Sequence, residues 1–227
     1  MRAPGFVPAR VMIAAMRLPA ADRELVQIVD ASLVRAAGQA GEWLVCRPGC
    51  TQCCYGAFAI NQLDAARLRA GMEALLAAEP DAAKVIEQRA RAWIAEFGAE
   101  FPGDRETGLL GESEDEQARF EDFASDAPCP ALDPATGLCG VYEWRPMTCR
   151  VFGPPVRMEG EEGAEGQRME GLGHCELCFN GATPEQVAAC EMPVPHELEA
   201  KLLNELTDGG ETNASGETVV AWALIGS

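Results

Sequence analysis

The stretch CRPGCTQCC, residues 46–54, puts four cysteines within nine positions: Cys46, Cys50, Cys53 and Cys54. Pro48 and Gly49 bend the chain between them, so the thiols can converge within one short loop. Such a set suits a soft metal better than a hydrophobic core, because thiolates are preferred ligands of zinc and of iron–sulfur clusters. The adjacent side chains of Cys53 and Cys54 should diverge, which indicates two metals, two parts of a larger cluster, or one structural thiol. We therefore predict a domain built around a cysteine-rich loop.

Six more cysteines follow this stretch: Cys129, Cys139, Cys149, Cys175, Cys178 and Cys190. Ten cysteines in 227 residues is above ordinary usage but below the density of a small disulfide scaffold. Arg17 ends the apolar run at 11–16 before it reaches the length of a signal-peptide core, and no stretch is as long as the roughly 20 apolar residues of a membrane span. We expect a soluble, cytoplasmic protein, whose clustered cysteines bind metal or do redox work; the alternative, a disulfide network, requires an oxidising compartment.

The charge balance limits the expected partners. Lys and Arg number 18 and Asp and Glu number 36, which gives a formal net charge of −18. A surface this acidic repels phosphate groups, so we expect neither nucleic acid nor an anionic membrane as a partner. A metal ion is the expected partner, and a protein partner stays open. The hydrophobic content of 48% supports a core that needs no disulfides to compensate for small size.

Hydrophobic periodicity predicts helices more often than strands. Residues 22–39 form an amphipathic pattern whose apolar face is Leu25, Ile28, Val29, Leu33 and Ala36. Two further helices, capped by Asn61 and Asp81, read as a helical hairpin that Gly98 ends. Shorter helices are expected over 116–124, from Thr183 onward and over 196–206, and short strands over 55–60 and 219–225. The predicted fold class is mainly α with minor short β, with the hairpin and flanking helices around a cysteine-rich loop core.

This pattern predicts one domain with two loose ends. Residues 1–20 read as a loose N-terminal extension, residues 21–207 as a single cysteine-cluster metal-binding domain, and residues 208–227 as a flexible tail with a possible terminal strand. Residues 159–173 are acidic and rich in glycine, which predicts a mobile loop.

A second cysteine-rich segment, residues 127–152, reads APCPALDPATGLCGVYEWRPMTCRVF. Residues 133–137 predict a turn between Cys129 and Cys139, and a single helical turn over 140–144 then leads to Cys149. Further on, residues 173–175 read GHC and supply another thiol.

Taken together, C-x3-C-x2-C-C, then C-P-x-L…G-x-C-x-V-Y-x-x-R-P-x-x-C-R, then G-H-C resembles the YkgJ-like cysteine-cluster family over about residues 43–178. That family is named after a CxxCxxCC motif, is described as zinc- or iron-chelating, and includes the flagellin lysine N-methylase. The resemblance implies eight metal ligands: Cys46, Cys50, Cys53, Cys54, Cys129, Cys139, Cys149 and Cys175. The first spacing is one residue longer than the family motif, which would make Cys46 a peripheral ligand, and Cys178 competes with Cys175 for the last position.

Several residues beside the cysteines allow two interpretations. Arg145 and Arg150 flank Cys149, where a positive charge would stabilise thiolates, although each arginine could instead pair with a carboxylate. We favour the first interpretation. Cys190 is expected to be a buried small hydrophobe, and His174 either binds metal or is an exposed loop residue.

The predicted function is therefore that of a metal-binding protein with a cysteine-ligated zinc or iron–sulfur centre. The alternatives are a metal-dependent enzyme, for which lysine N-methylation is the family precedent, and a structural or interaction protein stapled by metal. Radical S-adenosylmethionine enzymes share the C-x3-C-x2-C spacing, but Gln52 stands where they carry an aromatic residue and no β/α series follows. We expect Cys50, Cys53, Cys129, Cys139 and Cys149 to lie close together in space, with the two arginines beside them.

Overall fold

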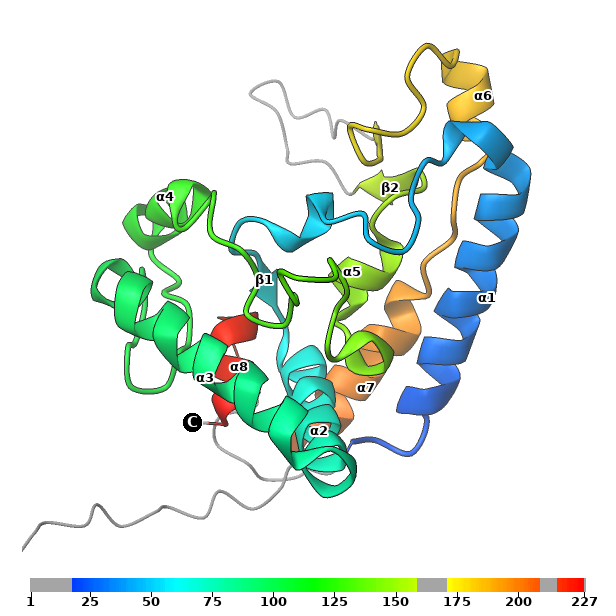
Figure 1. The fold of residues 1–227 in the computed structure, drawn as a ribbon. Helices are drawn as coiled ribbons and strands as arrows, with labels where there is room; N and C mark the ends of the chain where they lie inside the picture. Colours follow the sequence, from blue (N-terminus) through cyan, green and yellow to red (C-terminus); the bar gives the residue numbers. More distant parts are fainter. Residues whose placement is uncertain (1–17, 159–170, 209–215, 227) are drawn as a thin grey trace, which may run out of the picture.

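The computed structural model describes residues 18–158, 171–208 and 216–226 (Figure 1). Over these residues the chain is mainly α with minor short β, which confirms the predicted fold class. The helices are α1 (Asp22–Ala40), α2 (Gln62–Ala78), α3 (Pro80–Phe97), α4 (Glu114–Asp122), α5 (Met147–Val151), α6 (Pro184–Ala188), α7 (His196–Asp208) and α8 (Val220–Ile225). The strands are β1 (Ala59–Ile60), β2 (Val156–Met158), β3 (Gly171–Gly173) and β4 (Thr218–Val219). The expectations for residues 1–17, 159–170 and 209–215 lie outside the described residues.

Helices α2 and α3 form the predicted hairpin, and α8 packs against both. The Asn61 side chain accepts a hydrogen bond from the backbone N–H of Asp64 at 3.0 Å, which confirms the predicted cap of α2. The predicted cap of α3 is wrong, because that helix begins at Pro80 and Asp81 lies in its first turn. Proline is well placed there, since the first helical N–H has no partner within the helix.

The end of the chain differs from the sequence prediction. Strand β4 is only two residues long and pairs antiparallel with β1, so that Ala59 faces Val219. Residues 220–225, predicted as a continuation of that strand, form helix α8 instead, and Val220 through Leu224 are all buried. An apolar run that is buried on every side has no periodicity to distinguish a strand from a helix.

Helices α1, α5 and α7 form the other side of the core, together with the start of α2. The buried residues of this cluster include Leu25 and Val29 of α1, Met147 of α5 and Leu202 of α7. Ile28, predicted on the same face of α1, is 39% exposed because it lies at the edge of the apolar stripe.

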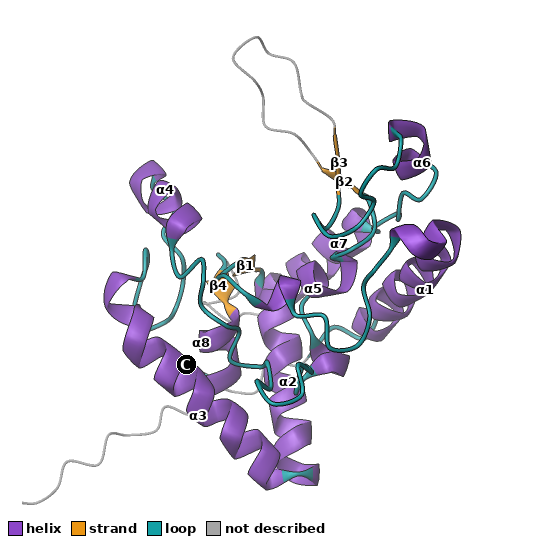
Figure 2. Cartoon of the chain, turned by 45° about the horizontal axis from the view of Figure 1, so that its top comes forward, coloured by secondary structure: helices purple, strands orange, loops and turns teal. Residues whose placement is uncertain are grey.

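The cysteine-rich loops lie between these two sides of the core. In Figures 1 and 2 the loops over residues 44–58 and 124–146 run through the middle of the molecule, between the α2–α3 hairpin and α1. Strands β2 and β3 pair in a separate two-stranded sheet beyond α5. Among the described residues, none of the helices combines the length and the hydropathy that a membrane crossing requires.

Candidate metal centre

The loop at 46–54 makes two successive turns that separate its cysteines. Gly49, at φ +88°, allows the first turn, in which the Cys50 N–H donates to the Arg47 carbonyl at 2.9 Å. The second turn is a short 3-10 helix, Gln52–Cys54, in which the Cys54 N–H donates to the Thr51 carbonyl at 2.8 Å. Cys50 therefore lies on one turn, and Cys53 and Cys54 lie on the next. The loop can thus contribute thiols to two different sites.

The second cysteine-rich segment is attached directly to the end of this loop. The Cys129 N–H donates to the Cys54 carbonyl at 2.7 Å, next to an antiparallel bridge between Tyr55 and Pro128. A second bridge joins Leu132 to Cys139 and closes the predicted turn at 133–137. The two bridges bring Cys129 and Cys139 beside Cys54.

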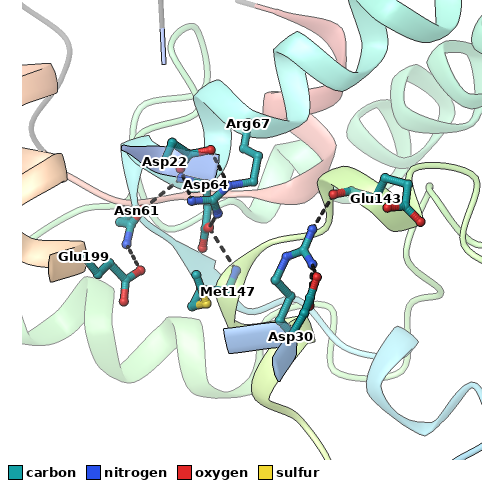
Figure 3. Close-up of polar contacts among 9 residues, drawn as sticks. Asp22, Asp30, Asn61, Asp64, Arg67, Glu143, Met147 and Glu199 are labelled. Carbon is teal, nitrogen blue, oxygen red and sulfur yellow. Dashed lines mark hydrogen bonds and ion pairs between the residues drawn. The ribbon is translucent and has the colours of Figure 1, made fainter. Parts of the chain in front are cut away.

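Helix α5 positions Cys149 and is anchored to α2 by a buried carboxylate. The Met147 N–H, in the first turn of α5, donates to Asp64 Oδ1 at 2.9 Å (Figure 3). Asp64 also pairs with Arg67, whose guanidinium reaches Asp22 of α1 at 2.5 Å. A first-turn N–H has no partner within its own helix, so Asp64 supplies one and ties three helices together.

Five thiols form what we call the first thiol group: Cys53, Cys54, Cys129, Cys139 and Cys149. Each lies within electrostatic reach of others in the group, since the charges of Cys53, Cys129 and Cys139 all act on Cys149, and those of Cys129 and Cys139 act on Cys54. Burial raises the pKa of Cys129 to about 12 and raises those of Cys139 and Cys149. Buried, mutually repelling thiols resist deprotonation until a cation compensates their charge.

Cys53 is the exception in this group. The pKa of Cys53 is lowered to about 6, chiefly by a side-chain hydrogen bond from Cys54 and also by the nearby charge of Arg145. The same hydrogen bond raises the pKa of Cys54. The expected divergence of the two side chains is therefore wrong: Cys53 and Cys54 face each other, and Cys53 is the thiolate available first.

Backbone amides also point at the sulfurs. The N–H groups of Ala131 and Leu132 donate to Cys129, that of Val141 donates to Cys139, and each lowers the pKa of its cysteine. Hydrogen bonds to the charged form stabilise a thiolate, so these turns prepare the sulfurs to act as ligands.

Four thiols form the second thiol group: Cys46, Cys50, Cys175 and Cys178. The charges of the other three all raise the pKa of Cys46, and Cys46 Sγ lies 3.8 Å from Cys178 Sγ. Cys50, which we expected beside Cys53 and Cys129, is therefore grouped with Cys46. Of the expected set, Cys53, Cys129, Cys139 and Cys149 lie in the first thiol group, and Cys50 lies within electrostatic reach of Cys46 and Cys175. Cys190 is buried close to Cys175 and Cys178 within an apolar cluster.

The two arginines have different surroundings. Arg145 stacks on the Tyr142 ring at 3.9 Å from its centroid, and its charge lowers the pKa of Cys139 as well as that of Cys53. Arg150 donates to both carboxylate oxygens of Asp30, at 2.8 and 2.9 Å, and to the Glu143 carbonyl. Arg145 also reaches Asp30, at 3.7 Å, but its charge acts on the thiols, whereas the contacts of Arg150 are those of an ion-pair partner.

Arg89 and Asp64 also belong to the site, although the sequence pattern did not mark either residue as a functional one. Arg89 of α3 donates to the Leu132 carbonyl at 2.6 Å, and its charge lowers the pKa of Cys139. The proximity of Ile86 and Ala90, which are buried on the same helix, was the available signal that Arg89 faces inward. Asp64 was visible only as part of the cap of α2.

The cysteine thiols fit a thiophilic metal, but their placement does not match the coordination of a single ion. All ten cysteines are free thiols. Within the described residues, no three Cys, His, Asp or Glu side chains converge closely enough to hold one ion as they are placed. The five separated thiols of the first thiol group suit a cluster of several metal atoms better than one tetrahedral ion, because such an ion takes four ligands.

Comparison with known proteins is consistent with this chemistry. No curated protein and no solved structure matches the chain significantly. Residues 45–165 match the family described as "CxxCxxCC: Putative zinc- or iron-chelating domain". Because the matched region covers more than half of the 227 residues and contains both cysteine-rich segments, the chain belongs to the CxxCxxCC family of zinc- or iron-chelating domains.

Proposed function

We propose that the chain is a metal-binding protein whose first thiol group holds an iron–sulfur cluster. One observation carries the proposal: five thiols from the two cysteine-rich segments lie within electrostatic reach of one another beside Arg145. A bound cluster would supply several iron atoms with coordination positions for separated thiolates. Zinc is the other candidate, and it would use four of the five thiols.

The chain's own residues prepare this site in three ways. Cys53 is ionised most readily, because Cys54 and Arg145 stabilise its thiolate. The amide N–H groups after Cys129 and Cys139 stabilise those sulfurs in the charged form. Asp64 holds the first turn of α5, and thereby fixes the position of Cys149. The first-choice ligands are accordingly Cys53, Cys129, Cys139 and Cys149, with Cys54 as the fifth thiol.

The enzyme alternative predicts a polar cavity that opens beside the metal and the arginines. A cavity of about 240 Å³ does lie beside α5, and Asn61, Asp64, His196 and Glu199 line it together with Met147 and Thr148. Neither a cysteine nor Arg145 nor Arg150 lines this cavity. Cys129 does line a smaller cavity of about 20 Å³, but the other residues around that one are apolar. The observation therefore favours metal chelation over a reaction at the metal.

Anaerobic purification, metal analysis and visible absorption test the proposal. We expect iron and acid-labile sulfide, with the broad visible absorption of an iron–sulfur cluster. Cys139→Ser and Cys149→Ser should lose both, whereas Cys190→Ser, which removes a buried thiol outside both groups, should retain them. A colourless protein whose metal content does not respond to Cys139→Ser or Cys149→Ser would contradict the proposal.

A further inference from the structure

The second thiol group brings together two short cysteine pairs that are far apart in the sequence. Cys46 and Cys50 are separated by three residues in the first loop, and Cys175 and Cys178 by two residues after β3. Pairs with these spacings are typical of structural zinc sites, in which each pair contributes two of four thiolates. The family resemblance did not assign Cys178 as a ligand together with Cys175.

Backbone hydrogen bonds shape the second cysteine pair, and one of them joins its segment to the chain just before the first pair. The Phe179 N–H, next to Cys178, donates to the Trp43 carbonyl at 2.9 Å, and the Cys175 N–H donates to the Gly153 carbonyl at 3.2 Å. The Cys178 N–H donates to the Cys175 carbonyl at 2.9 Å and closes a turn around the pair. Gly153 itself leaves room for Cys46, because a Cβ there would lie 3.1 Å from Cys46 Sγ.

The sulfur spacing agrees with zinc. Cys46 Sγ and Cys178 Sγ are 3.8 Å apart. A tetrahedral site with Zn–S bonds of about 2.3 Å places neighbouring sulfurs about 3.8 Å apart, whereas a disulfide requires about 2.0 Å. One edge of a tetrahedron is thus already present, and Cys50 and Cys175 would turn toward it on binding.

The site differs in kind from an ordinary buried cysteine cluster. Cys175 and Cys178 are 2% and 1% exposed, in an apolar cluster that includes Ala40, Phe179 and Cys190. Cys46 Sγ nevertheless approaches Cys178 Sγ to 3.8 Å, so the cluster directs two sulfurs toward each other and does not pack them against carbon alone. Cys190, buried in the same cluster, belongs to neither cysteine pair and is a matched control.

We infer that Cys46, Cys50, Cys175 and Cys178 form a second, separate metal site, which takes one zinc ion. The bound zinc would cross-link the beginning of the cysteine-rich loop to the segment after β3. A closed set of four thiolates leaves no open position, so this zinc is structural and does not depend on which metal the first thiol group holds.

The test is metal analysis of the reduced, full-length chain purified without oxygen, with variants in both groups. Cys178→Ser and Cys46→Ser should each lower the zinc content by about one equivalent. The visible absorption spectrum of the first centre should be unchanged in both variants. Cys46→Ser is included because Cys46 is exposed and its replacement need not disturb the core. Cys190→Ser should keep the zinc. Cys139→Ser should lose the first centre but should also keep the zinc.

Cobalt(II) provides a second measurement that does not depend on activity. Added to the zinc-depleted, reduced chain, it should give the intense visible d–d bands of tetrahedral thiolate coordination, and these should weaken strongly in Cys178→Ser but not in Cys190→Ser.

Three results would overturn the inference. These are unchanged zinc in both Cys46→Ser and Cys178→Ser, equal zinc loss in Cys190→Ser, or a Cys46–Cys178 disulfide in the protein as purified without oxygen and before any reductant is added, detected as a mass two hydrogens lower. An intact iron spectrum alongside any of these would leave the proposed function standing. A zinc site without an iron–sulfur spectrum would instead refute the proposed cluster alone.

Discussion

The backbone N–H of Cys129 donates a hydrogen bond to the carbonyl oxygen of Cys54, at 2.7 Å. This contact joins the last residue of the first cysteine-rich stretch to the first cysteine of the second. It uses backbone groups only, so it holds the two loops in register whatever the state of the thiols. The contact explains how segments separated by the whole α2–α3 hairpin can contribute to one group of ligands.

Metal removal should destabilise the protein. The buried thiols of the first group acquire their full ligand strength only in the folded chain, so the binding free energy adds to the free energy of unfolding. A metal concentration 1,000 times the dissociation constant contributes about 4 kcal/mol, which corresponds to a Tm shift of roughly 10 °C for a domain of this size. We expect a fall of this size when a chelator is added to the reduced protein. An unchanged melting curve would show that the apolar clusters stabilise the fold alone.

Arg145 and Arg150 should respond differently to substitution by alanine. Arg145→Ala removes a charge that stabilises the Cys53 thiolate, so metal retention should fall about 10–100-fold, measured by competition with a chelator. Arg150→Ala removes the hydrogen bonds to Asp30 and to the Glu143 carbonyl, and leaves only the longer Arg145 contact, at 3.7 Å, beside Asp30. Its main effect should be a loss of about 2–3 kcal/mol from the free energy of unfolding of the metal-free protein. Equal metal loss in both variants would refute this distinction.

The stability of the protein should depend on the ionisation of Asp64. Burial raises the pKa of Asp64 from 3.8 to about 6, against the opposing effect of Arg67. Between these two pH values the folded state binds more protons than the unfolded state, so this group's contribution to the free energy of unfolding decreases as pH rises from about 4 to 6 and levels off above that. The full difference is at most about 3 kcal/mol.

Asp64→Asn should remove this component of the pH dependence. Asparagine keeps an oxygen that can accept from the Met147 N–H but carries no titrating charge. Urea unfolding at several pH values, compared between the wild-type protein and the variant, isolates the contribution of Asp64 from those of the other carboxylates. Parallel curves for the two proteins would show that Asp64 titrates normally in the folded state.

Gly153→Ala should disturb the second thiol group. Gly153 has φ +127°, which an alanine rarely adopts, and its added Cβ would lie 3.1 Å from Cys46 Sγ. We expect a loss of about 1–3 kcal/mol together with weaker zinc retention. Gly38→Ala in helix α1 is the matched control, because no atom lies within 4 Å of its added Cβ. That variant should stabilise the protein by about 0.5–1 kcal/mol, since alanine is the better helix former.

The sequence by itself determined the long helices and the chemistry of the site. Apolar periodicity predicted α1 and the α2–α3 hairpin, and Asn61 was correctly identified as a cap, because these signals act within a few residues. The cysteines, the turn at 133–137 and the position of Arg145 before Cys149 were also visible, which was enough to predict a thiophilic metal. The uniform apolar run at 220–225 was misread as a strand because it has no periodicity.

Only the tertiary structure decided which thiols belong together. Cys50 and Cys53 are three residues apart, but successive turns direct them into different groups, and Cys50 lies with Cys175 and Cys178 instead. Likewise, the sequence could not distinguish Arg145 from Arg150, since their roles depend on Asp30 and Glu143. Residue type and spacing specify which atoms can bind a metal. The selection among them depends on contacts between distant segments, such as that between Trp43 and Phe179, which are formed only when the whole chain folds.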